Sequence, residues 1–105
     1  MKKVYHKLVR DRIPEIIGQQ GNRCVTRILE PEEYLQMVDA KLDEELAEYH
    51  RDRNLEELAD LMEVIFAAAQ ARGYTREQLE QVRARKEAER GAFRKGLLLL
   101  EVDEG

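Results

Sequence analysis

The segment from Asn54 to Arg72 constrains the fold more than any other part of the chain, because its residues are apolar on nearly every side of a helix. At about 100° per residue, the clearly polar positions fall on one stripe, which is formed by Glu56, Glu63 and Gln70. Such a helix is stable only when most of its sides are buried. A chain of 105 residues has too few other helices to bury it alone. We therefore predict a helical bundle that assembles at least as a homodimer.

The composition agrees with a helical protein and argues against several other classes. Charged residues make up 38% of the chain, well above the average protein, and there are only 6 Gly and 2 Pro. The single cysteine, Cys24, cannot form an intramolecular disulfide, which favours a reducing, cytoplasmic location. The net charge of −4 argues against non-specific nucleic-acid binding. Neither a signal peptide nor a membrane-spanning stretch is expected from the apolar runs.

Local signals predict a single domain over residues 1–105, with a mostly α fold of about four helices and a minor pair of short strands. Asn54 is a typical helix N-cap, and Thr75 with Gln78 has the spacing of a capping box. The polar stretch His50–Arg53 predicts a turn. The expected helices cover Val9–Gln20, Pro31–Tyr49, Asn54–Arg72 and Thr75–Arg90, and the expected strands cover Cys24–Leu29 and Leu97–Val102.

Several carboxylates are predicted to lie on apolar helix faces. On the helix over residues 31–49, Glu45 falls inside the apolar arc and Glu48 lies at its edge, whereas Glu44 is nearer the solvent side. On the next helix, Glu57 and Asp60 lie off the polar stripe, among apolar residues. A carboxylate on an apolar face is costly unless something compensates its charge. These acids are therefore expected to point into an interior or an interface.

The spacing of these acids suggests a cation site. Glu45 with Glu48, and Glu57 with Asp60, are each separated by three residues, so each pair can face one point. Two carboxylates about 5 Å apart repel by roughly 1–3 kcal/mol, and a buried set would become protonated or recruit a cation. Oxygen ligands suit Mg²⁺ or Mn²⁺ better than Zn²⁺. A run such as Asp43–Glu48 is also typical of a solvated helix face, and periodicity alone leaves both interpretations open.

The order of several motifs resembles that of the all-α, MazG-like nucleoside triphosphate pyrophosphohydrolases. Glu44-Glu45-x-x-Glu48 followed by Glu57-x-x-Asp60 resembles the paired acidic signature of that superfamily. Three further blocks resemble its small, phosphoribosyl-ATP pyrophosphohydrolase-like branch. These are the opening Tyr5–Ile17, the block Lys41-Leu-x-Glu-Glu-Leu, and Glu89-Arg-Gly-x-Phe93 with the strand-like stretch Leu97–Glu101 that follows. The resemblance extends over nearly the whole chain.

The resemblance implies Mg²⁺-dependent hydrolysis of a nucleoside triphosphate to the monophosphate and pyrophosphate, with Mn²⁺ as a substitute metal. The implied metal ligands are Glu45, Glu48, Glu57 and Asp60. Glu44 and Glu45 are the implied catalytic acids, Glu44 as a water-orienting group. The candidates for binding the nucleotide and its phosphates are Lys7, Arg10, Asp11, Lys41, Lys86 and Arg90. The implied assembly is a homodimer or homotetramer with the nucleotide near the subunit interface.

Two alternatives stay open at this point. Phosphoribosyl-ATP hydrolysis in histidine synthesis shares the chemistry but needs room for a second phosphoribosyl group. A non-catalytic helical module that binds a nucleotide or a protein would explain the helices and the charge, but not the acids on apolar faces. Only eight residues separate Glu48 from Glu57, a shorter connection than in longer members of the superfamily, which favours a compact helical hairpin.

Overall fold

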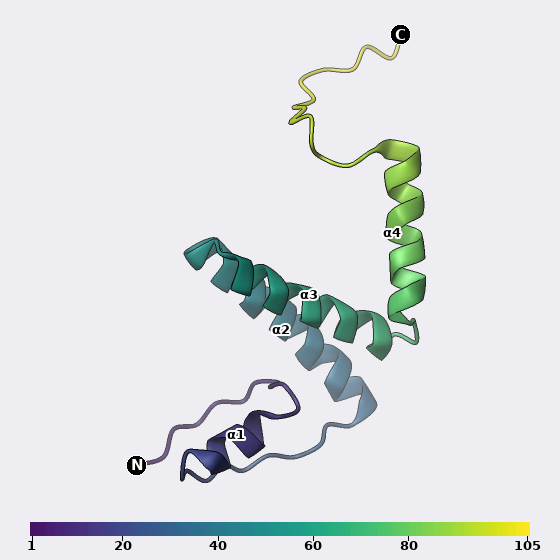
Figure 1. Cartoon of the computed structure of the whole chain (residues 1–105). Helices are drawn as coiled ribbons and strands as arrows, with labels where there is room; N and C mark the ends of the chain where they lie inside the picture. The colour runs from purple at the N-terminus through teal and green to yellow at the C-terminus, as the bar shows by residue number, and fades with distance from the viewer.

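The computed structural model describes residues 1–105 and contains four helices and no β-strand. The helices are α1 (Ile13–Gln19), α2 (Pro31–Asp52), α3 (Leu55–Ala71) and α4 (Arg76–Arg90) (Figure 1). The prediction of a mostly α fold with about four helices is confirmed. None of the four helices combines the length and the apolarity that a bilayer crossing requires.

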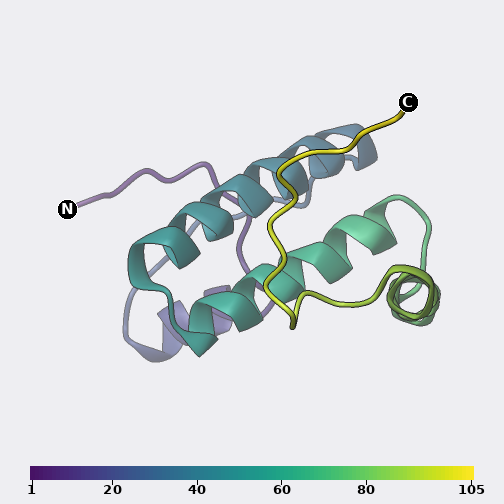
Figure 2. The ribbon, with the colours of Figure 1, turned by 90° about the horizontal axis from the view of Figure 1, so that it is seen from above.

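Helices α2 and α3 form a hairpin that is the centre of the molecule (Figures 1 and 2). Val38 of α2 and Val64 of α3 are its buried apolar residues. The predicted turn at His50–Arg53 begins later than expected, since α2 continues to Asp52. Arg53 then adopts a left-handed conformation with φ 51°, which ends the helix. The hairpin connection is therefore only two residues long.

Two side chains cap α3 and α4 as the sequence predicts. The Asn54 side chain accepts a hydrogen bond from the backbone N–H of Glu57, at 2.9 Å. Thr75 and Gln78 form a complete capping box at the start of α4. Each cap satisfies backbone donors that the first helical turn leaves without partners. By contrast, the predicted helix over Val9–Gln20 is too long, because α1 begins at Ile13, directly before Pro14.

Helix α4 stands away from the α2–α3 hairpin, and the chain beyond it extends further still (Figure 1). The radius of gyration is 18.5 Å, whereas a compact chain of this length has a radius of about 13 Å. The accessible surface is 9,909 Å², against about 6,100 Å² for a compact monomer of this mass. A single copy thus leaves far more surface exposed than a self-sufficient domain does.

The predicted strand pair is wrong for the isolated chain. Residues 24–29 lie between α1 and α2, and residues 97–102 follow α4, at the opposite end of the molecule (Figure 1). Both segments are free of regular secondary structure, and neither has a neighbouring strand. A strand exists only through its hydrogen bonds to another strand, so an apolar pattern without an adjacent partner is insufficient.

Candidate functional site

The carboxylates of Glu45, Glu57 and Asp60 converge on one point between α2 and α3. One oxygen atom of each lies within 4.8 Å of the others. The two-residue hairpin connection sets the register of the helices, and the Asn54 cap fixes the backbone at Glu57 in the first turn of α3. Asp60 follows one turn later on the same helix face. The hairpin itself therefore brings these acids together.

A second group of acids shares Glu45 with the first. Oxygen atoms of Glu44, Glu45 and Glu48 on α2 also lie within 4.8 Å of one another. The four predicted metal ligands consequently lie in two overlapping clusters whose common member is Glu45. Glu45 is 6% exposed, the most buried charged side chain of the protein. Its burial confirms the sequence-based placement of this carboxylate inside the apolar arc of α2.

Two carboxylate oxygens in this site have no hydrogen-bond partner although they are fully buried. They are Oε2 of Glu45 and Oε2 of Glu57. An unpaired polar atom away from water costs roughly 1–3 kcal/mol, and more when it is charged. Buried carboxylates are otherwise paired with a cation or bound to a metal. Within the acidic site, therefore, these two oxygen atoms have no positive charge to compensate them.

The local environment makes ionisation of Glu45 unfavourable. Burial raises the pKa of Glu45 above its usual range, and the neighbouring carboxylate of Glu48 adds to the rise. Lys41 opposes both effects, because its Nζ lies 3.3 Å from Oε1 of Glu45. Lys41 is the only basic side chain that pairs with Glu45 itself, and it does not outweigh the burial and the Glu48 carboxylate.

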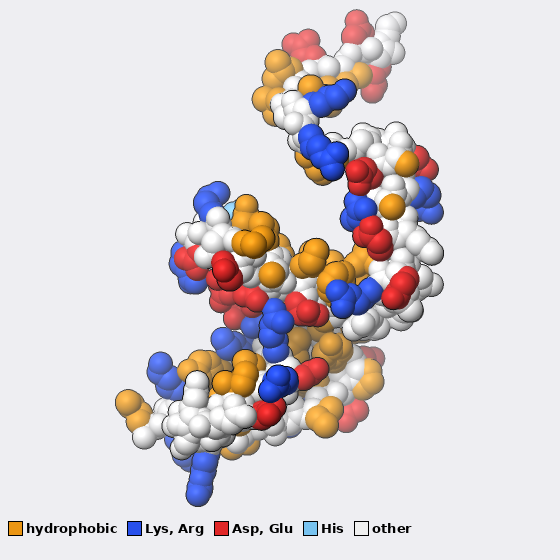
Figure 3. All heavy atoms as spheres, in the orientation of Figure 1, with side chains coloured by type: hydrophobic (Ala, Val, Ile, Leu, Met, Phe, Trp, Pro, Cys, Tyr) orange, Lys and Arg blue, Asp and Glu red, His pale blue; other side chains and the backbone are white.

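Basic side chains lie beside acidic ones where the N-terminal segment meets the hairpin (Figure 3). Lys7 Nζ lies 3.5 Å from Glu44, and Lys41 Nζ lies 3.3 Å from the same oxygen atom of Glu44. Arg10 donates a 2.8 Å hydrogen bond to Oδ1 of Asp60. Three of the predicted phosphate-binding residues are thus brought to the acidic site by the structure.

The other three predicted nucleotide-binding residues are not brought to the acids. The Asp11 side chain makes no hydrogen bond or ion pair, and Arg10 contacts Asp60 instead of this neighbour. Lys86 and Arg90 are exposed on α4, which stands apart from the hairpin (Figure 1). Arg90 lines an open hollow of about 650 Å³ with the loop residues 91–97. In one copy of the chain, therefore, α4 contributes no charge to the acidic site.

Sequence reasoning misses Glu63, which helical periodicity places on the polar stripe of α3. Its Oε1 lies 4.0 Å from the Arg10 guanidinium, next to the shorter contact with Asp60. Glu63 follows Asp60 by three residues, the same spacing that singles out Glu57 and Asp60. This three-residue spacing is the sequence feature from which the position of Glu63 beside Asp60 could be predicted. Glu63 thus extends the row of acids on α3 by one turn.

The residues present fit a hard divalent cation. Carboxylate oxygens are the ligands that Mg²⁺ and Mn²⁺ prefer, and the two unpartnered oxygens of Glu45 and Glu57 supply a place for positive charge. Ligand oxygens around octahedral Mg²⁺ lie about 3–4 Å apart. In each cluster the carboxylate oxygens lie no more than 4.8 Å apart. Small side-chain rotations would therefore suffice to form the inner coordination sphere.

Comparison with known proteins finds a partial relative and no functional assignment. The chain is 57% identical over 42 residues to an uncharacterized protein of Mycolicibacterium smegmatis. The match covers 40% of this chain and 43% of the relative, less than half of either. No family model matches the chain. No solved structure matches it either.

Proposed function

We propose that this protein is a metal-dependent nucleoside triphosphate pyrophosphohydrolase that releases pyrophosphate and a nucleoside monophosphate. The observation that carries the proposal is the pair of buried, unpartnered oxygens on Glu45 and Glu57, within a cluster of acids contributed by two helices. The order of motifs along the chain, which resembles that of the MazG-like enzymes, supports the same function. A non-catalytic helical module gives no reason to bury these oxygens.

In this proposal Glu45, Glu48, Glu57 and Asp60 hold Mg²⁺, which neutralises charge on the triphosphate when bound. Water attacks the α-phosphorus, a new P–O bond forms, and the bond between the α-phosphorus and the bridging oxygen breaks. Pyrophosphate leaves with the electrons of that bond. Glu44 orients the water and accepts its proton. Glu45, the other carboxylate proposed for catalysis, is also one of the metal ligands. Both lie on consecutive positions of α2.

Lys7, Arg10 and Lys41 are the proposed phosphate-binding residues on the hairpin side of the site. All three already lie within 3.5 Å of carboxylate oxygens there. A bound triphosphate would compete with the acids for these cations, since phosphate and carboxylate accept the same hydrogen bonds. The other three candidates can take part only if another part of the structure, such as a second copy, brings them to the acids. They are Asp11, Lys86 and Arg90.

The proposed assembly is a homodimer or homotetramer. Four exposed apolar residues follow one another at three- and four-residue steps along α3. They are Leu55, Leu58, Met62 and Ile65. Such a stripe is typical of a helix that packs against another helix. In one copy no element covers it, so a second copy is the partner we propose.

The decisive experiment measures pyrophosphate release from standard and modified nucleoside triphosphates and from phosphoribosyl-ATP. The assay is run with Mg²⁺, with Mn²⁺ and with a chelator. Asp60→Asn should abolish release, whereas Glu56→Gln, which removes an exposed acid of the same helix outside the site, should leave it intact. Release that persists in chelator or in Asp60→Asn would refute the proposed role of the acids. Release only from phosphoribosyl-ATP would select that substrate.

A further inference from the structure

Two extended segments of the chain leave all their backbone hydrogen-bonding groups without protein partners. They are residues 23–29, between α1 and α2, and residues 97–102, after α4. No backbone N–H or C=O of either segment takes part in a backbone hydrogen bond. Extended backbone in this state is able to pair edge to edge with another segment.

Both segments also expose apolar side chains. Leu97, Leu98, Leu99 and Leu100 are each at least 77% exposed. Val25 and Ile28 are 100% and 97% exposed. Burying one leucine side chain is worth about 1.5–3 kcal/mol, so these residues supply a driving force for pairing that the isolated chain leaves unused.

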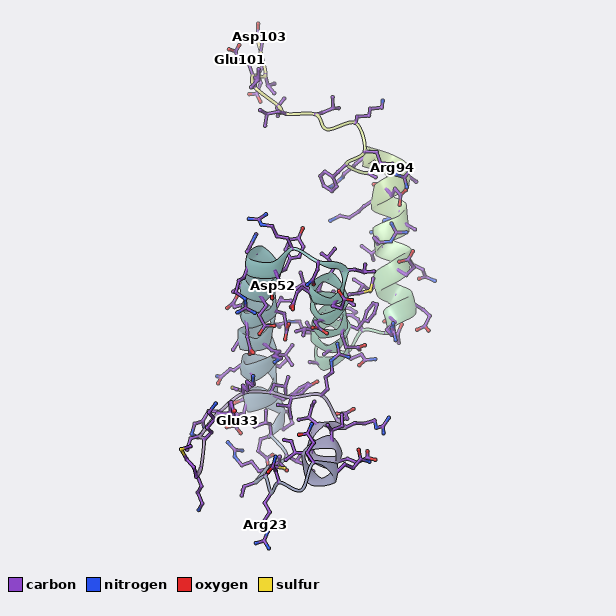
Figure 4. The ribbon with its side chains drawn as sticks, turned by 60° about the vertical axis from the view of Figure 1, so that its left-hand side comes forward. Arg23, Glu33, Asp52, Arg94, Glu101 and Asp103 are labelled. Carbon is purple, nitrogen blue, oxygen red and sulfur yellow. The ribbon has the colours of Figure 1, made fainter.

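The geometry places the two segments too far apart to meet within one copy. The molecule is 64 Å long, and the segments lie at its opposite ends. In Figure 4, Arg23 marks one end, whereas Glu101 and Asp103 mark the other. The surface in excess of a compact monomer is about 3,800 Å². An obligate dimer buries about 2,000–5,000 Å² in total, or about 1,000–2,500 Å² from each copy, so pairing with a second copy accounts for about a quarter to two-thirds of this excess.

The charges of the two segments are complementary when they run antiparallel. Residues 23–29 begin with Arg23, and residues 97–102 end with Glu101 and Val102, directly followed by Asp103. Neither Arg23 nor Glu101 makes an ion pair within the chain. An antiparallel register that sets Arg23 opposite Asp103 joins the charged ends and sets Ile28 and Leu29 opposite Leu98 and Leu97. Arg27, which pairs with Glu33 of its own chain, then lies opposite Leu99. A parallel pairing separates the charged ends.

We propose that residues 97–102 of one copy pair as an antiparallel β-strand with residues 23–29 of a second copy. The exchange is reciprocal, as twofold symmetry requires. The sequence-predicted strand pair then forms between copies instead of within one. It is independent of the metal site and of any catalytic activity.

Cys24 provides the test, because it is the only cysteine and lies in the first segment. In the proposed register it lies opposite Val102. The full-length variant Val102→Cys is oxidised with a mild thiol oxidant and analysed by non-reducing electrophoresis and mass spectrometry. Arg85→Cys, an exposed position on α4 outside both segments, is the matched control. We expect about tenfold more covalent dimer, joined from Cys24 to the introduced thiol, than in the control, since a disulfide needs Cα atoms within about 7 Å.

Three outcomes would overturn the proposal. An intramolecular disulfide between Cys24 and the thiol introduced by Val102→Cys would show that α4 folds back within one copy. Equal dimer yield from Val102→Cys in a Cys24→Ser background would show that the two C-terminal segments pair with each other. A yield no higher than that of Arg85→Cys would exclude the pairing. Because neither metal nor nucleotide enters this experiment, its failure leaves the proposed enzymatic function untouched.

Discussion

The guanidinium of Arg10 lies 2.8 Å from the Oδ1 atom of Asp60, although fifty positions separate the two residues in the chain. This ion pair ties the segment before α1 to the acidic site on the α2–α3 hairpin. Both side chains are partly exposed, so the pair itself contributes little to the free energy of folding. Its consequence is electrostatic, because Arg10 competes with any cation for Asp60.

Replacing Arg10 by Gln should therefore have opposite effects on two ligands. In the absence of nucleotide, Mg²⁺ should bind about two- to fivefold more tightly, the range that a partly exposed ion pair supports. Nucleoside triphosphate should bind more weakly because a phosphate contact is lost. Isothermal titration calorimetry measures both. Arg12→Gln, which removes a nearby arginine that pairs with Glu15, is the control and should change neither. Weaker Mg²⁺ binding in Arg10→Gln would contradict the competition.

Removal of the buried charge at Glu45 should stabilise the metal-free protein. Glu45→Gln keeps the side-chain size but removes the negative charge, whose burial and repulsion from Glu48 destabilise the folded protein. We expect a higher melting temperature than wild type in chelator. Saturating Mg²⁺, which at 100 times its dissociation constant stabilises a folded protein by about 2.7 kcal/mol, should raise the wild-type melting temperature but not that of the variant. A variant less stable than wild type in chelator would refute this view of the site.

The same variant isolates a pH effect on the metal-free protein. The pKa of Glu45 is raised above its usual 4.5 in the folded state, so folding favours the protonated carboxyl. The stabilising contribution of the protonated form is fully present below the unfolded pKa and is lost as pH rises through the folded pKa. The difference in melting temperature between Glu45→Gln and wild type should accordingly be largest at neutral pH. It should shrink as the pH falls toward 4.5. If the difference in melting temperature does not change with pH, ionisation of Glu45 is not its cause.

The Asn54 cap is predicted to serve the site as well as the helix. Asn54→Ala removes the hydrogen bond to the backbone N–H of Glu57 and should cost about 0.5–2 kcal/mol of stability. It should also weaken Mg²⁺ binding, because Glu57 loses its fixed position. Thr75→Ala is the matched control, since it removes a cap of similar strength from α4, away from the acids. If both variants lose the same Mg²⁺ affinity, the loss comes from general destabilisation of the protein and not from the position of Glu57.

Local signals predict the parts of the structure that depend on neighbouring residues. The caps at Asn54 and Thr75 are present, and the rotation of α2 correctly predicts that Glu45 is buried. Helical periodicity shows which face a side chain occupies but not what lies across from it. The contact between Arg10 and Asp60 is therefore beyond the sequence. So is the position of α4, which leaves much of the apolar surface of α3 exposed in one copy.

The predicted strands also show that a periodic pattern does not specify the partner of a segment. The apolar pattern of residues 97–102 is strand-like, but a strand also needs a neighbour. Nothing in a periodic pattern specifies whether that neighbour belongs to the same chain. Likewise, α2 passes through the polar residues 50–52 as a helix because polarity alone does not break the helical hydrogen bonds. Only the left-handed conformation of Arg53 ends them.

The position of all four proposed metal ligands on one short-looped hairpin has a kinetic consequence. Contacts between residues close in sequence form early, because little chain entropy is lost when they close. Glu45 and Asp60 should already face each other in the folding transition state, before the terminal segments find their places. Their mutual repulsion then slows folding itself. Mg²⁺ should consequently accelerate folding, because its site is already formed in the transition state. A ligand whose site forms only after the transition state would mainly slow unfolding.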